Sequence, residues 1–182
     1  MLLRMAPNMF QDKKYGAFTV RSIREEFVRT SKFKDKYPWR SNSAGSIRAL
    51  LSSHPKILEI ESNKKIIDAQ IISGRTNKKT GRRFDLSRED RELVAWALAL
   101  NGFVISNDQD IEDYGHQEFS GLFMGRLSPL EILNDWLEEG LLTWDDTLQC
   151  YLDDWKTNSE KPQPTREKRR FNKLTGYQYV GS

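Results

Sequence analysis

The fold depends on the stretch Ser87-Arg-Glu-Asp90-Arg-Glu-Leu-Val-Ala-Trp-Ala-Leu-Ala-Leu100, which runs directly into Asn101-Gly102-Phe-Val-Ile-Ser-Asn-Asp108-Gln-Asp110. The first part predicts a helix, and its apolar residues surround nearly the whole helix, so we expect neighbouring elements to cover it on most sides. Gly102 is the expected stop of this helix. The short apolar run Phe103–Ile105 then predicts a buried strand with an acidic end.

Two carboxylates are expected to meet at one edge of the sheet. Ser87 is the predicted N-cap of the helix, and Asp90 at its third position resembles the acid of a capping box. Asp108 follows the predicted strand, which returns to the edge where the helix began, and open α/β folds place their sites at such edges. Clustered carboxylates repel one another unless a hard cation lies among them, so the pattern points to Mg²⁺ or Mn²⁺.

The composition narrows the class of protein. A length of 182 residues favours one domain with a tail. The net charge of +3 hides an asymmetry: residues 87–155 hold 3 Lys/Arg against 16 Asp/Glu, whereas residues 11–86 hold 18 against 8. A basic surface around an acidic edge suits a polyanion such as nucleic acid. The single cysteine fits a reducing cytoplasm, and the absence of an apolar run of 18 residues predicts no membrane span.

Other segments are predicted from periodicity and turn signals. Helices are expected over Ser22–Thr30, Ala44–Leu51, Asn63–Ile72, from Pro129 to about Glu139, and over Trp144–Trp155, and a short strand over Ala17–Val20. The predicted loop Ser73–Arg83 is rich in glycine and cations. Glu112 and Asp113 are expected to be solvated. Residues 156–182 are basic and rich in proline, which predicts a flexible tail.

Four pieces occur in an order that resembles the PIN domain, a family of metal-dependent nucleases. The pieces are Arg24-Glu25-Glu26-Phe27, then Leu86-Ser87-x-x-Asp90-Arg-Glu-Leu-Val-Ala-x-Ala, then Val104-Ile-Ser-Asn-Asp108-Gln-Asp110, then Leu127-Ser-Pro-Leu-Glu-Ile-Leu. The resemblance covers roughly residues 1–140. It implies an α/β fold with a parallel sheet in a three-layer α/β/α sandwich, and a domain over residues 1–155.

The resemblance also implies roles for individual residues. Asp90, Asp108 and Glu26 match the catalytic acids that hold Mg²⁺ or Mn²⁺, with Glu25 as the rival of Glu26, and Asp110 matches an auxiliary metal-binding acid of some members. The implied activity is hydrolysis of RNA. Contacts to RNA are expected from the loop cations and from an aromatic residue among cations: Lys78, Lys79, Arg82, Arg83 and Trp39.

One family feature has no counterpart in this sequence. PIN domains begin with an apolar strand that ends in Asp, whereas the first acid here is Asp12 and no such strand precedes it. Either Met1 lies downstream of the true start, or the chain is a degenerate member without the first metal ligand. The alternative to a nuclease is therefore an inactive PIN-like module that binds nucleic acid or protein. Some PIN nucleases are toxins, so a small antitoxin protein is a further candidate partner, and the fold also allows a homodimer.

Overall fold

The computed structural model describes residues 1–11, 17–40, 49–50, 54–158 and 162–180. The chain forms two compact units. We call Thr19–Arg24 with Ala49–Arg126 the mixed unit, and Met1–Phe18 with Glu25–Arg48 and Leu127–Ser182 the helical unit. The sequence predicts a domain boundary at residue 155, but the structure groups residues on both sides of that position in the helical unit.

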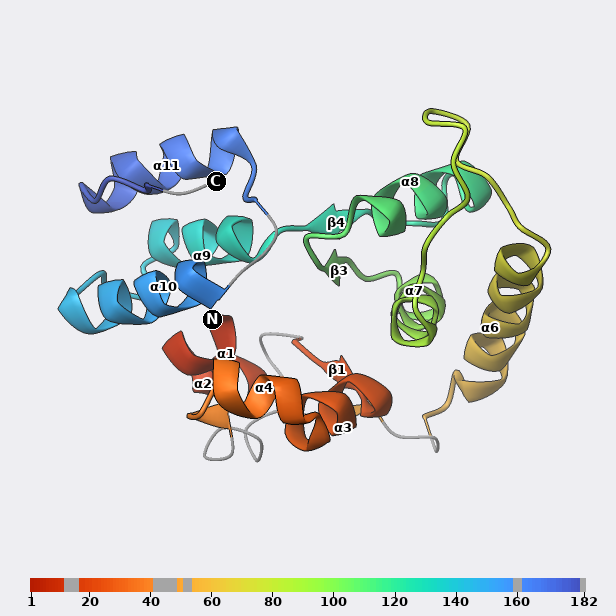
Figure 1. Ribbon diagram of the computed structural model, residues 1–182, viewed down its shortest axis with the longest axis horizontal. Helices are drawn as coiled ribbons and strands as arrows, with labels where there is room; N and C mark the ends of the chain where they lie inside the picture. The colour runs from red at the N-terminus through yellow and green to blue at the C-terminus, as the bar shows by residue number, and fades with distance from the viewer. Residues whose placement is uncertain (12–16, 41–48, 51–53, 159–161, 181–182) are drawn as a thin grey trace. The chain divides into compact units, whose positions relative to one another are not determined.

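The mixed unit is built around α7 (Arg88–Leu100), which contacts α6 (Ile57–Ile72) and α8 (Gln109–Glu118). Strands β1 (Thr19–Val20) and β3 (Val104–Ile105) also contact α7, which Figure 1 shows end-on between these elements. Its core is formed by buried residues of α7 and its neighbours, among them Val94, Ala95, Ala99, Ile67, Ile111 and Tyr114. The prediction that α7 is covered on most sides is confirmed, because every residue from Val94 to Ala99 is buried.

The strands of this part of the chain are short. Strand β1 pairs in parallel with β2 (Ala49–Leu50), with Thr19 opposite Ala49 and Val20 opposite Leu50. Strand β3 pairs with β4 (Arg126–Leu127) in a second two-stranded sheet. The fold therefore mixes helices with a parallel pair of strands, which agrees with an α/β class at this coarse level. The helix predicted over Ala44–Leu51 is wrong at Ala49–Leu50, and its other residues lie outside the described ones.

The helical unit contains α1 (Leu2–Met5), α2 (Pro7–Gln11), α4 (Ser31–Lys36), α9 (Pro129–Glu138), α10 (Asp146–Asn158) and α11 (Thr165–Thr175). Helix α3 (Arg21–Arg29) begins in the mixed unit and ends in this one. Helix α9 opens with the predicted capping box of Ser128 and Glu131, with Pro129 at its first position. The core of this unit joins Leu2, Leu130, Leu133, Leu152 and Phe171.

The segment predicted to be a flexible tail contains an ordered helix. Helix α11 contacts α9, and the side chain of Phe171 is fully buried. Three cations of this helix, Arg166, Arg169 and Lys173, are exposed, whereas Phe171 and Glu167 are buried. The expected tail is thus replaced by α11 within the described residues 162–180.

Candidate functional site

Asp90 stands in the first turn of α7 and belongs to a complete capping box. Its Oδ2 atom accepts hydrogen bonds from the backbone amide and hydroxyl of Ser87, at 3.1 and 2.6 Å, and the Ser87 Oγ atom accepts from the Asp90 amide at 3.0 Å. Both bonds to the carboxylate use the same oxygen. The other oxygen, Oδ1, accepts no hydrogen bond from any residue that the structure describes.

Asp108 is the N-cap of α8, in the turn that follows β3. Its Oδ1 atom accepts a hydrogen bond from the backbone amide of Asp110 at 2.9 Å, and its own amide donates to the Ser106 hydroxyl at 3.0 Å. A carboxylate at this place is stabilised by the amide groups and dipole of the helix start. Local hydrogen bonds therefore fix the backbone around Asp108.

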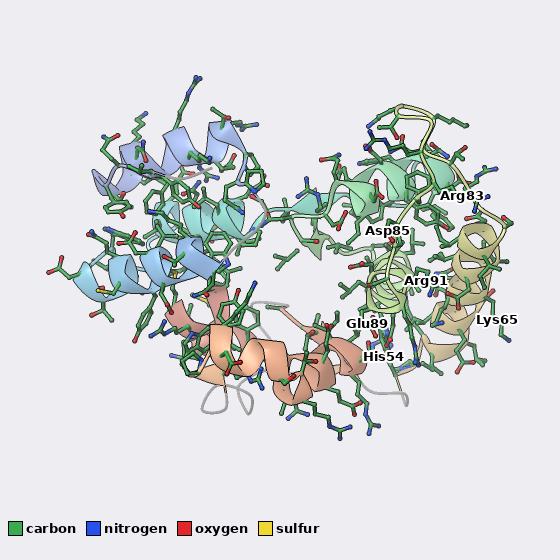
Figure 2. All side chains as sticks on the ribbon, viewed as in Figure 1. His54, Lys65, Arg83, Asp85, Glu89 and Arg91 are labelled. Carbon is green, nitrogen blue, oxygen red and sulfur yellow. The ribbon has the colours of Figure 1, made fainter. Side chains whose placement is uncertain are left out.

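Asp110 connects the starts of the two helices. Its Oδ2 atom accepts a hydrogen bond from the backbone amide of Asp85 at 2.9 Å, and Asp85 lies two residues before the N-cap of α7. Figure 2 labels Asp85 on the segment that enters α7. The first turn of α8 and the entrance of α7 are thus joined by a carboxylate whose Oδ1 atom has no donor among the described residues.

Carboxylate oxygens are the ligands that could hold a metal ion at these helix starts. In the part of the chain that the structure describes, no group of three or more Asp, Glu, His or Cys side chains is close enough to hold a metal ion. An all-protein cage is therefore not formed by these residues. Mg²⁺, however, is commonly held by one or two carboxylates together with waters and substrate phosphates. The free oxygens of Asp90 and Asp110 suit that kind of ligation.

A cation that sequence reasoning missed supports the turn before Asp108. The guanidinium of Arg126 donates to the backbone carbonyl of Ser106 at 2.6 Å and to the Gln109 side chain at 3.2 Å. The Arg126 side chain is only 14% exposed, and Glu112 lies 3.9 Å from it. The sequence does carry a signal for Arg126, because it is one of only three Lys/Arg residues in the acidic segment 87–155.

The predicted basic loop is a docked hairpin, which we call the basic hairpin (residues 75–83). Thr76 and Arg83 form an antiparallel bridge, and the nearly buried Asn77 donates to Asp113 of α8 at 2.9 Å. At its start, Arg75 forms two hydrogen bonds with Glu118, at 2.8 and 2.7 Å. The expectation that Asp113 is solvated is wrong, because its residue exposure is only 7%.

The four predicted RNA-binding cations of the hairpin are not equivalent. Lys79 pairs with Asp113 at 2.5 Å, although the lysine side chain is still 72% exposed. The side chains of Lys78, Arg82 and Arg83 are exposed and form no ion pair with any described residue. Arg83 is labelled in Figure 2. The hairpin therefore presents three exposed cations that form no ion pair with a described residue, an arrangement suited to contact with phosphates.

Two acids of α8 hold the hairpin, and the pKa of each is lowered below its ordinary value. Burial alone would raise the pKa of Asp113, but hydrogen bonds from Lys79, Asn77 and Gln109 outweigh it and lower the pKa below its ordinary value. The pKa of Glu118 is lowered chiefly by its hydrogen bonds with Arg75. Both carboxylates therefore remain charged near neutral pH and fix the hairpin.

The other predicted site residues, Glu25, Glu26 and Trp39, belong to the helical unit. Glu25 pairs with Arg29 at 4.0 Å, whereas Glu26 forms no ion pair with a described residue, and the choice between the two as a ligand stays a prediction. The Trp39 ring packs 6.1 Å from Phe27, with Arg4 5.3 Å above it. These contacts give Trp39 a packing role in the structure, and its role in RNA binding stays a prediction.

Comparisons with family models, curated proteins and solved structures give no match to this chain. In the described ranges, every helix is too short or too polar to cross a lipid bilayer. The assignment of function therefore depends on the arrangement of the carboxylates and cations of the chain itself.

Proposed function

We propose that this protein is a metal-dependent endoribonuclease of PIN type, with its site where α7 and α8 begin. The observation that carries the proposal is the hydrogen bond from the Asp85 amide to Asp110, which joins the two helix starts and leaves one oxygen of Asp110 free. The proposal includes the family's parallel sheet in a three-layer α/β/α sandwich. Two helix starts with acidic side chains, held together, favour this function over a purely structural one.

The residues of the site have separate tasks in this proposal. Asp90, Asp108 and Asp110 would bind Mg²⁺ or Mn²⁺ directly or through water, and for Asp90 and Asp110 the binding atom would be the oxygen that accepts no hydrogen bond from a described residue. When bound, the ion lowers the pKa of a water and neutralises charge that develops on the phosphate. Arg126 positions the turn that carries Asp108, through its hydrogen bond to Ser106. A metal-binding role of Glu26, which lies in the helical unit, stays a prediction from the sequence.

Contact with RNA would come from the basic hairpin. Lys78, Arg82 and Arg83 are exposed and form no ion pair with a described residue, and the hairpin that holds them is fixed to α8, the helix that follows Asp108. Phosphate contacts position a nucleic acid without reading its sequence. The proposal therefore predicts binding that weakens steeply with salt and depends little on base sequence.

The test is cleavage of a labelled single-stranded RNA in Mn²⁺ by the full chain, with and without EDTA. The variant Asp90→Asn/Asp108→Asn keeps hydrogen-bonding side chains at both positions but removes both charges. The proposal expects cleavage that is abolished by EDTA and strongly reduced in the double variant. Cleavage that survives both changes would come from another site or another protein.

A second candidate is a PIN-like module that binds nucleic acid without cutting it. It is favoured by the capping bonds that Asp90 already makes and by the lack of a group of three metal-binding side chains among the described residues. This candidate expects RNA binding at full strength and no turnover in Mn²⁺. An antitoxin-like protein partner and a cytoplasmic location stay predictions, and co-purification of a small protein that blocks cleavage would support the first of these.

A further inference from the structure

Helix α11 is held firmly on the helical unit by its inner side. Phe171 packs edge-on against Trp144, with ring centroids 4.8 Å apart, and against Tyr177 at 5.9 Å. The Asn134 amide of α9 donates to the backbone carbonyl of Glu167 at 2.9 Å and to its carboxylate at 3.0 Å. These contacts fix the orientation of α11 on the helical unit, and its outer side is left exposed.

Two cations of α11 are used in contacts within the unit. Arg170 forms a hydrogen bond with Asp135 at 2.7 Å and a closer one with Glu138. Lys168 lies 5.6 Å from the centre of the Tyr179 ring. Their charges are balanced or covered by partners, so these two residues are poorly suited to bind an external ligand.

The other three cations of α11 form a line on its outer side, which we call the basic stripe (Arg166, Arg169 and Lys173). Their spacing of three and four residues places them on one face of a helix. All three residues are exposed, and Arg169 and Lys173 form no ion pair with any described residue. Arg166 lies 3.7 Å from Glu167, but its side chain is 91% exposed. At 1.5 Å per residue, the stripe spans about 10 Å.

A line of separate charges fits a ligand with repeated negative charges better than a single anion, which needs donors that converge on one point. A membrane surface fits less well, because a helix that binds lipid buries an apolar face in the bilayer. Of the two large apolar residues of α11, Phe171 has no exposed surface and Leu174 is 37% exposed, so the helix offers little apolar surface to a bilayer. The phosphate backbone of a nucleic acid carries repeated negative charges, and it can bind the cations of a helix without an apolar face.

We propose that the basic stripe binds the phosphate backbone of single-stranded RNA. The stripe lies on a different unit from the basic hairpin, so the protein carries two basic surfaces on separate supports. The identity of the polyanion rests on the proposed function. The contact itself does not depend on catalysis, so it can be tested where cleavage is switched off.

The experiment measures binding of a fluorescently labelled single-stranded RNA to the full chain by anisotropy, in EDTA and at several salt concentrations. The test variant is Arg166→Gln/Arg169→Gln/Lys173→Gln. The control is Arg24→Gln/Arg29→Gln/Lys65→Gln, which changes the net charge equally at other exposed positions. Circular dichroism checks that each variant keeps its helix content.

Loss of three contacts to single-stranded RNA is expected to make the slope of log affinity against log salt shallower by about 2, and to weaken binding roughly tenfold to a hundredfold at 0.1 M salt. The control should bind nearly as well as the parent chain. Equal weakening of both variants, or no weakening of the stripe variant, would overturn the proposal. So would a stripe variant that keeps RNA binding and loses binding to phosphatidylserine vesicles.

Failure here is distinct from failure of the proposed nuclease. Cleavage in Mn²⁺ reports on Asp90 and Asp108, whereas binding in EDTA reports on the stripe. A chain that cleaves RNA but binds it equally well without the stripe refutes only this inference. If RNA binding weakens in the stripe variant but the parent chain never cleaves RNA, only the nuclease proposal is refuted.

Discussion

The Asp110 carboxylate accepts a hydrogen bond from the Asp85 backbone amide over 2.9 Å, so the first turn of α8 holds the segment that enters α7. The two residues are 25 positions apart in the sequence. In the proposed site, this contact fixes the spacing of the carboxylates at the two helix starts. Asp110 would thus have a structural bond on one oxygen and a metal-binding task on the other.

Two substitutions of Asp110 separate these tasks. Asp110→Asn keeps an oxygen that can accept the Asp85 bond, so we expect an almost unchanged free energy of unfolding but slower cleavage in Mn²⁺. Asp110→Ala removes the acceptor as well and should lower the free energy of unfolding by about 1 kcal/mol. Urea unfolding followed by circular dichroism measures this difference. Equal stability of the alanine and asparagine variants would show that the bond to Asp85 contributes nothing.

The acids that hold the basic hairpin predict a dependence of stability on pH. Because the pKa values of Asp113 and Glu118 are lowered in the folded state, their stabilising effect is complete above the unfolded values of about 4. It is lost as the pH falls through the lower folded values. The variant Asp113→Asn/Glu118→Gln should therefore be less stable than the parent at pH 6, with the difference shrinking towards pH 3.

Urea unfolding of the parent chain and of this double variant at pH 6, 5, 4 and 3 provides the measurement. A difference in unfolding free energy that stays constant over this range would contradict the assigned pKa directions.

Replacement of Asp113 by alanine is expected to lower the free energy of unfolding by about 1–3 kcal/mol at pH 6, because the buried Asn77 amide would lose its partner.

Gly115 of α8 is expected to tolerate no larger side chain. A Cβ atom at this position would overlap the Phe123 ring, so the ring or the helix must shift. We expect Gly115→Ala to destabilise the protein by about 1–3 kcal/mol, despite the better helix propensity of alanine. Gly102→Ala is the control, since nothing lies within 4 Å of its added Cβ. Thermal unfolding of the two variants compares them, and equal midpoints would refute the close packing of Gly115 against Phe123.

Phe171 is expected to be essential for the packing of α11. Its side chain has no exposed surface, and truncation of such a phenylalanine to alanine typically costs about 3–5 kcal/mol. Leu174→Ala in the same helix serves as the control. Because Leu174 is 37% exposed, its replacement should lower the free energy of unfolding much less. Guanidinium unfolding provides the comparison. A Phe171→Ala variant as stable as the control would indicate that α11 does not pack as the structure shows.

The elements that could be predicted from the sequence are those with local signals. The start of α7 follows from the capping box of Ser87 and Asp90, and the start of α9 from that of Ser128 and Glu131. Both depend on residues three positions apart. The end of α7 shows the limit of this precision, because Asn101 rather than Gly102 adopts the left-handed conformation, with φ of 51°. Asparagine is one of the few residues that tolerate it.

The elements that were missed depend on contacts between distant residues. Helix α11 is stabilised by Trp144, which lies 27 residues before Phe171, and by Asp135, which lies 35 residues before Arg170. The basic hairpin is fixed by Asp113, 36 residues from Asn77. No local pattern reveals such pairs, so a cation-rich segment is easily mistaken for a solvated tail or loop. The same reason hides the contact between Asp110 and Asp85.

The measurement that tests the nuclease proposal most directly is single-turnover cleavage of a labelled RNA in Mn²⁺, with the protein in excess. It compares the parent chain with Asp108→Asn and with Glu61→Gln, a charge-neutralising change at an exposed glutamate of α6. Loss of a metal ligand should remove several kcal/mol of charge stabilisation, so Asp108→Asn is expected to be at least about 100-fold slower, with Glu61→Gln unchanged. Equal rates for the parent and Asp108→Asn would contradict the proposed site.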